Sequence, residues 1–264
     1  MTRAILIIVT IVAATLILPA NAQAVQILPG DLLVDGFLYG PDVVTNPINP
    51  LDPRTQTYYV KIYRGSTLVV TFQLPSYGDL NQGRDGFIYT GGSNHVNRLD
   101  ANGSIVSTLG PDPNLPRFLS FNRAGDLYAA DTLGQTVRRF GLDGSLAATY
   151  TLGGGGAEGI DLAADQCTLY FTLGGSRAVK RWDVCRDVPL TPLASSLPGQ
   201  FPAALRILPD GNLLVADGVP GIMMLDATGL LLRSYPLHGR PIRSRQPYCA
   251  AILGLCRGLS RTAV

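Results

Sequence analysis

A sequence unit of about 42 residues recurs along this chain, and it constrains the fold more than any other feature. Each copy begins with an apolar residue after a turn, and a second apolar or aromatic residue follows 11 to 13 positions later. The first residues are Ile88, Leu127, Leu169 and Leu213, and the second residues are Leu99, Phe140, Trp182 and Leu225. Repetition at this period predicts a stack of similar structural units.

The pattern within each unit predicts four short antiparallel strands. A turn rich in Asp and Gly follows the second residue, at 100–103, 142–144 and 226–229, and another β-rich run comes after it. A further short β-rich run precedes the first residue, at 118–121, 160–162 and 205–207. Four such strands form one propeller blade, and blades bury both of their faces only by stacking around an axis. We therefore expect an all-β protein, a β-propeller of four-stranded blades.

A fifth, degenerate unit precedes the other four. The segment Gly30–Val34 matches Gly125–Ala129, and the runs 58–63 and 68–72 supply the outer strands of this unit. The propeller is therefore expected to span residues 25–237, with about five recognisable blades.

The unit resembles the NHL repeat and, more loosely, the propellers of the SMP-30 (gluconolactonase) family. The resemblance rests on "AGDLYAADTLGQTVRRFGLDGS" at 124–145 and "PDGNLLVADGVPGIMMLDATG" at 209–229, and it extends over about 30–237. It implies a propeller that often closes with six blades, so this one is expected to be of the six-bladed type with a truncated C-terminus, or five-bladed. These folds host binding scaffolds, lyases and hydrolases alike, so the resemblance implies little about activity.

The N-terminus has the composition of a secretory signal. Arg3 is followed by an apolar run from Ala4 to Leu18, then by Pro19 and two overlapping A-x-A sites. We expect a signal peptide over residues 1–22, with cleavage after Ala22 or Ala24, and a secreted or periplasmic protein that leaves the membrane on cleavage. The alternative is an uncleaved membrane anchor, because the run approaches the roughly 20 residues that span a bilayer.

The last residues, 238–264, differ in composition from the repeats. They contain five arginines and no acid, and they lack strand-like alternation. They are interpreted either as a truncated or frame-shifted end or as a flexible tail on a five-bladed propeller. The chain has a formal net charge of +2, and without Arg3 and these five arginines the body carries −4, so we expect no nucleic-acid partner.

Four cysteines in an exported chain allow three pairings. The fourth unit, with the degenerate one counted first, contains a hairpin between the runs of Leu169 and Trp182. If Tyr170 faces Trp182 across this hairpin, Cys167 faces Cys185 in the same register. Opposed residues of an antiparallel pair have the spacing that a disulfide needs. We predict this bridge and expect it to stabilise the fold by about 3 kcal/mol. The state of Cys249 and Cys256 stays open.

The candidate binding residues lie where the propeller topology gathers them. The start of each first strand and the end of each second strand share one rim, which places Arg117, Glu158, Asp131 and Asp217 on the same face. These residues are our candidates for holding a cation or a polar ligand. The alternative for Asp131 and Asp217 is structural, because a short carboxylate often accepts hydrogen bonds from its own turn.

The family resemblance adds a metal hypothesis for this rim. Gluconolactonase-like enzymes bind a divalent cation with Glu, Asn and Asp on this face, and "EGI" at 158–160 is similar to the Glu element. It implies Glu158 as a ligand of Ca²⁺ or another divalent cation. The neighbouring strand, however, carries Arg117-Phe118 where the resemblance calls for Asn.

Two further segments, a glycine-rich run and a proline-containing insertion, could carry a function. Residues 154–159 match the dinucleotide fingerprint G-x-G-x-x-G, but the run that follows is β-rich rather than helical, so we interpret the glycines as a connection between blades. Residues 36–57 form a proline-containing insertion that is expected to be a loop on the same rim, either functional or disordered.

Two functions from different classes follow. The first is an exported, non-catalytic propeller that binds a small molecule, a glycan or a protein at its rim. The second is a divalent-metal-dependent hydrolase of the gluconolactonase type that uses Glu158, with Asp131 and Asp217 as companions. A lyase on the same scaffold is a more remote third hypothesis.

Overall fold

The computed structural model describes residues 10–13, 30–39, 56–74, 78–92, 94–110, 116–173, 176–199, 202–217 and 221–236. In these ranges every regular element is a β-strand, and no helix is long and apolar enough to cross a bilayer. Most of the expected signal peptide, the C-terminal segment 238–264 and two of the four cysteines lie outside the described residues.

The strands form five antiparallel sheets of four strands each, and four of these sheets correspond to the clear repeats. Blade 2 contains β5 (Leu80–Gln82), β6 (Ile88–Gly91), β7 (Val96–Leu99) and β8 (Ile105–Leu109). Blade 3 contains β9 (Pro116–Phe121), β10 (Leu127–Asp131), β11 (Thr136–Phe140) and β12 (Leu146–Thr151). Blade 4 contains β13 (Ala157–Leu162), β14 (Thr168–Leu173), β15 (Val179–Asp183) and β16 (Val188–Ala194). Blade 5 contains β17 (Pro202–Ile207), β18 (Leu213–Asp217), β19 (Gly221–Leu225) and β20 (Leu231–Pro236).

Blade 1 corresponds to the degenerate unit. It contains β1 (Thr10–Ala13), β2 (Gly30–Tyr39), β3 (Gln56–Arg64) and β4 (Thr67–Gln73). Strand β1 falls within the segment expected to be a signal peptide and pairs with β2, with Thr10 opposite Leu33. Cleavage at either expected site would therefore remove one strand of this blade.

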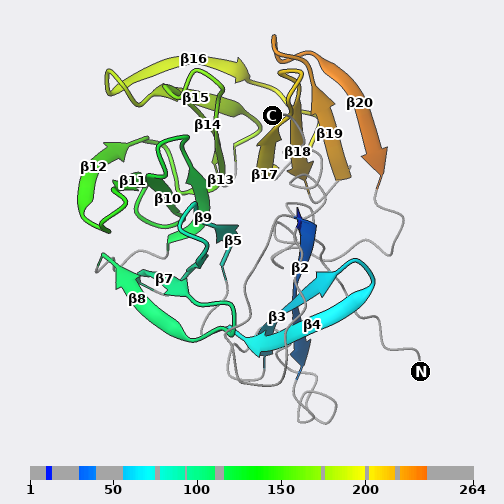
Figure 1. Cartoon of the computed structure of the whole chain (residues 1–264). Helices are drawn as coiled ribbons and strands as arrows, with labels where there is room; N and C mark the ends of the chain where they lie inside the picture. The colour runs from blue at the N-terminus through cyan, green and yellow to red at the C-terminus, as the bar shows by residue number, and fades with distance from the viewer. Residues whose placement is uncertain are drawn as a thin grey trace, which may run out of the picture.

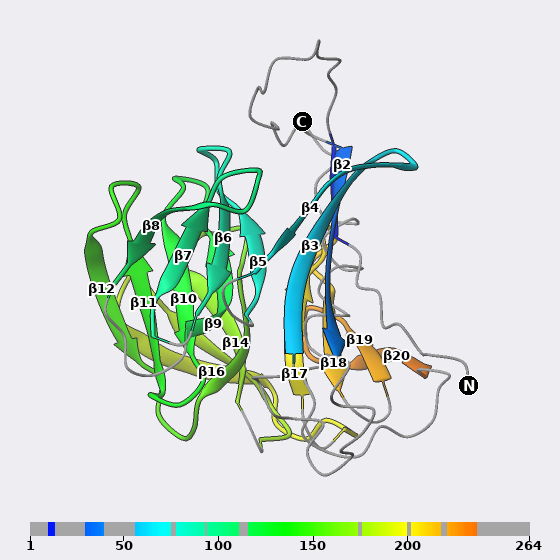
Figure 2. The ribbon, with the colours of Figure 1, turned by 90° about the horizontal axis from the view of Figure 1, so that it is seen from below.

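The sheets stand around a common axis in chain order, which is the arrangement of a β-propeller (Figure 1). Strands β5, β9, β13 and β17 lie nearest the centre, and β8, β12, β16 and β20 lie at the circumference. The view from the side shows the strands of blades 2, 3 and 4 running roughly along this axis (Figure 2). The predicted fold class is confirmed.

The two residues that mark each repeat are cross-strand partners. Ile88 pairs with Leu99, Leu127 with Phe140, Leu169 with Trp182 and Leu213 with Leu225. They occupy the same register position in four blades, because the apolar side chains of successive blades must meet at the same height to exclude water.

Hydrophobic clusters join consecutive blades. Val60 and Ile62 of blade 1 pack with Leu80 and Ile88 of blade 2, and similar clusters continue through blades 3, 4 and 5.

The predicted loop at 36–57 is partly wrong. Strands β2 and β3 stay paired as far as Tyr39 and Gln56, so 36–39 and 56–57 belong to a long hairpin. The aromatic and β-branched residues at its ends, such as Phe37 and Tyr58, favour a strand over a loop. Residues 40–55 lie outside the described part of the chain.

The predicted disulfide between Cys167 and Cys185 is confirmed, with 5.2 Å between the Cα atoms. The register from which it was predicted is wrong by one residue, because Trp182 pairs with Leu169 instead of Tyr170. The two cysteines lie just beyond the last strand pair. The N–H of Val184 donates to the carbonyl of Cys167 at 2.8 Å, and Cys185 follows in the turn.

Candidate functional site

Three inner strands bulge at the same position, and two of the bulges carry candidate residues. On β9, β13 and β17 the pairing with the next strand skips one residue, which is Arg117, Glu158 and Ala203 respectively. A bulge bends the strand and changes the direction of the side chain that it carries. Arg117 and Glu158 therefore occupy equivalent, bulged positions on adjacent blades.

The two candidate aspartates lie at the same rim, as the topology predicted. Asp131 is opposite Pro116 and Asp217 is opposite Pro202, so both are at the end of the blade where the bulges occur. Their side chains, however, are almost entirely enclosed, with 1% and 2% exposure. The structure thus brings the four residues to one rim without making a ring of exposed acids.

Asp131 is engaged by its own turn. Its Oδ1 accepts the N–H groups of Leu133 at 2.8 Å and Gly134 at 2.6 Å, and its Oδ2 accepts the hydroxyl of Thr136 at 3.4 Å. These are the contacts of a carboxylate that stabilises a turn. Asp217 lies against Gly199, where any side chain would collide with its carboxylate.

Glu158, one of the four candidate residues of the rim, has a shifted pKa. It is half-buried, and its burial raises the pKa of the carboxyl, while the positive charge of Arg117 acts in the opposite direction. Glu158 is also the only glutamate in the chain, against 18 aspartates. That unusual choice of residue at a repeat position is a sequence signal that points to the site.

The charged neighbour of Glu158 at the rim is a cation rather than a second acid. In the part of the chain that the structure describes, no three His, Cys, Asp or Glu side chains gather as a metal ion would require. Glu158 as a metal ligand stays a prediction.

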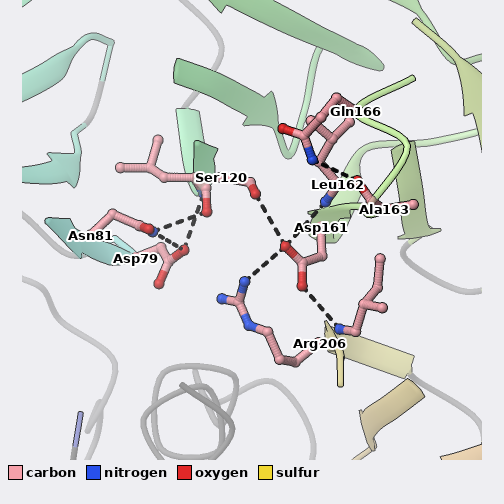
Figure 3. Close-up of polar contacts among 10 residues, drawn as sticks. Asp79, Asn81, Ser120, Asp161, Leu162, Ala163, Gln166 and Arg206 are labelled. Atoms are coloured by element: carbon pink, nitrogen blue, oxygen red, sulfur yellow. Dashed lines mark hydrogen bonds and ion pairs between the residues drawn. The ribbon is translucent and has the colours of Figure 1, made fainter. Parts of the chain in front are cut away.

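Sequence reasoning missed a second group of polar residues, which lies on the inner strands closer to the opposite rim. Asn81, Ser120, Asp161 and Arg206 occupy equivalent positions on β5, β9, β13 and β17, and Asp79 lies beside Asn81. All five are buried. Figure 3 shows their side chains converging between the strands.

Asp161 is the centre of this group. Its Oδ1 lies 2.8 Å from Nη1 of Arg206 and 3.2 Å from the hydroxyl of Ser120, and its Oδ2 accepts the N–H of Ile207 at 2.9 Å (Figure 3). One carboxylate from blade 4 thereby contacts blades 3 and 5.

Asp79 has a similar role between blades 2 and 3. Its Oδ2 accepts the N–H of Leu119 at 3.1 Å, and the amide of Asn81 donates to the carbonyl of Leu119 at 3.0 Å. Inner strands have no neighbouring strand on the side of the axis, so their backbone groups there need other partners. These side chains provide them and join the blades.

The glycine-rich run at 154–159 connects blades 3 and 4. Strand β13 begins at Ala157, so no helix follows and the dinucleotide fingerprint is accidental, as expected. Gly156 lies against the backbone of Thr132, where a Cβ atom would collide with the carbonyl. A close approach of two backbones accounts for this glycine.

Neither a protein-family model nor a curated protein sequence matches the chain. Solved structures do match it. A catalytically inactive virginiamycin B lyase from Staphylococcus aureus, determined with quinupristin, has a TM-score of 0.57 at 14% identity over 80% of this chain and 82% of that chain.

Two further structures match with a TM-score of 0.52 over 67% of this chain. One is a protein of unknown function from Bacteroides caccae, at 13% identity over 76% of its length. The other is hydrazine synthase from Kuenenia stuttgartiensis, at 19% identity, and the chain spans 53% of the length of that protein. At these identities the likeness supports the propeller fold and nothing finer.

Proposed function

We propose that this chain is an exported propeller of the NHL or SMP-30 kind that binds a small polar ligand at the rim formed by Glu158 and Arg117, without catalysis. The observation that carries the proposal is the placement of one acid and one cation on equivalent bulges of adjacent blades. Export is supported by the disulfide, because such bonds persist in oxidising compartments.

The chemistry of the pair suits a ligand that has hydrogen-bond donors and acceptors close together. A carboxylate accepts two or more hydrogen bonds, and a guanidinium donates up to five in a fixed plane. Vicinal hydroxyl groups of a sugar match both partners at once.

The alternative proposal is a divalent-metal-dependent hydrolase. It is supported by the similarity of "EGI" at 158–160 to the Glu element of gluconolactonases. The proximity of Arg117 weighs against it, because a cation beside Glu158 opposes the binding of a second cation. We therefore rank it below the binding scaffold.

Thermal unfolding of the chain with a panel of monosaccharides, in calcium or in EDTA, separates the two proposals. We expect a sugar to raise the midpoint equally in calcium and in EDTA, and Glu158→Gln or Arg117→Gln to abolish the rise. Asp187→Asn is the matched control: it removes one negative charge on the same blade, and Oδ1 of the new amide still accepts from Trp182.

A rise that requires calcium and disappears in Glu158→Gln would instead support the hydrolase and direct attention to lactone substrates. If neither sugar nor calcium shifts the midpoint, both proposals for this rim fail.

A further inference from the structure

A pocket of about 120 Å³ lies between blades 2 and 3 at the end of the molecule opposite Glu158. Leu127, at the start of β10, lines the pocket, whereas Asp131, at the end of the same strand, lies at the rim of Glu158. At roughly 3.3 Å per residue along a strand, the two sites are separated by more than 10 Å. The pocket is therefore independent of the proposed ligand site.

The inner wall of the pocket is aromatic and aliphatic. The rings of Tyr89 and Phe121 meet edge to face, with 5.2 Å between their centres, and Leu109 and Leu127 are buried beside them. An apolar cavity of about 150 Å³ is known to accept benzene. The pocket volume of about 120 Å³ is thus close to the volume that a single six-membered ring needs.

Most of the polar lining of the pocket is already satisfied internally. The carboxylate of Asp85 is paired with Arg98 at 2.8 Å and accepts the hydroxyl of Tyr89 at 2.8 Å. Asp143 accepts the N–H and hydroxyl of Ser145 at 3.0 and 2.7 Å. Asp85 is thus paired with a cation, and Asp143 accepts hydrogen bonds from its own turn.

Arg84 is the exception. It is exposed at the mouth of the pocket, and it forms no ion pair or hydrogen bond with any other residue that the structure describes. Its Cδ lies 3.8 Å from the position that a Cβ atom would take on Gly125. A larger residue at 125 would also meet Leu142 at 2.6 Å, so this glycine keeps the pocket open.

We propose that this pocket binds a small aromatic carboxylate. The ring lies against Tyr89 and Phe121, where it loses contact with water, and the carboxylate pairs with the guanidinium of Arg84 at the mouth. Arg84 and the aromatic wall line the same pocket, so one molecule of this class contacts both.

The test uses benzoate as the probe and the full exported chain, with binding followed by ligand-observed NMR. We expect binding in the millimolar range, which is typical of a ligand with so few atoms. Arg84→Gln is expected to weaken benzoate binding at least tenfold. Benzyl alcohol, which lacks the charge, is expected to bind the unmodified chain as weakly as benzoate binds Arg84→Gln.

Arg123→Gln is the matched control. Arg123 occupies the position of Arg84 in the next blade, because Gln82 and Phe121 are equivalent in register, and it does not line the pocket. Glu158→Gln is a second control that removes the proposed rim site. Both variants should bind benzoate as the unmodified chain does.

Ser107→Phe, which fills the pocket from β8, should abolish binding without changing Arg84. The proposal is overturned if benzoate does not bind. It is also overturned if Arg84→Gln and Arg123→Gln weaken binding equally. A Ser107→Phe variant that unfolds cooperatively, and is therefore folded, but still binds benzoate would overturn it as well.

Discussion

Asp161 on β13 and Arg206 on β17 form an ion pair that joins the inner strands of blades 4 and 5, with 2.8 Å between Oδ1 and Nη1. Only 10% of each side chain is exposed. The same carboxylate also accepts the hydroxyl of Ser120 and the N–H of Ile207. Three consecutive blades therefore depend on one buried acid.

Asp161→Ala should be among the most destabilising single changes in the chain. It removes the carboxylate that pairs with Arg206 inside the fold, and the loss of one partner of a buried pair costs about 3–5 kcal/mol. Ser120→Ala removes only one hydrogen bond to the same carboxylate and should cost about 1 kcal/mol. Urea unfolding measures both, and equal costs for the two variants would show that the ion pair is not the main connection.

Loss of the disulfide should lower stability by about 3 kcal/mol, because the bridge closes a loop with a sequence separation of 18 residues. The double variant Cys167→Ser, Cys185→Ser and the unmodified chain under reducing conditions should unfold at the same urea concentration. A reductant that leaves the midpoint of the unmodified chain unchanged would contradict the prediction.

The stability of the fold should depend on pH through Glu158. Burial raises its pKa, so the folded state binds the proton more tightly than the unfolded state does. Stability attributable to this group is therefore greatest below the unfolded pKa and falls as pH rises through the folded pKa. Glu158→Gln should raise the unfolding midpoint at neutral pH and have little effect at acid pH. A variant that is less stable at neutral pH would mean that an attraction, such as that of Arg117, outweighs burial.

Asp131→Ala should reduce stability without removing ligand binding at the rim. It leaves the N–H groups of Leu133 and Gly134 without their acceptor, at a cost of about 1–3 kcal/mol. Chemical unfolding measures the first effect, and the sugar-induced rise in midpoint measures the second. Loss of that rise at unchanged stability would place Asp131 in the binding site.

Gly156→Ala should be more harmful than Gly153→Ala. A Cβ atom at 156 collides with the backbone carbonyl of Thr132, so blades 3 and 4 would have to separate. At 153 the surroundings are open and only the positive φ of 65° is strained, which costs about 1–2 kcal/mol. Comparison of the two variants in urea tests this, and the reverse order would contradict the interpretation of the run as a tight connection.

The prediction of the disulfide shows how far register can be read from a sequence. Leu169 and Trp182 lie on facing strands, as predicted. Trp182, however, is opposite Leu169 and not opposite Tyr170, from which the disulfide was predicted. The turn after β15 absorbs that difference, because Val184 takes the place opposite Cys167 and Cys185 follows it. Turn conformation depends on contacts beyond the hairpin, which strand periodicity does not report.

The candidate rim shows a second limit. Topology placed Asp131 and Glu158 at the same end of the blades, and the structure agrees. Alternation along a strand, however, does not reveal a bulge, because a bulge adds one residue without a characteristic composition. That Arg117 and Glu158 are both bulged was therefore visible only in the pairing of the strands.

The sequence by itself determined the blades of this protein, because each blade is a set of neighbouring hairpins whose apolar residues repeat at fixed spacing. Tertiary structure alone decided which polar residues meet. Ser120 and Asp161 are 41 residues apart, and Asp161 and Arg206 are 45 apart, so they come together only when the blades pack. The pocket at Arg84 likewise exists because two blades leave space between their turns. Local periodicity encodes the hairpin, whereas the contacts between blades depend on the volume and shape of every side chain at the interface.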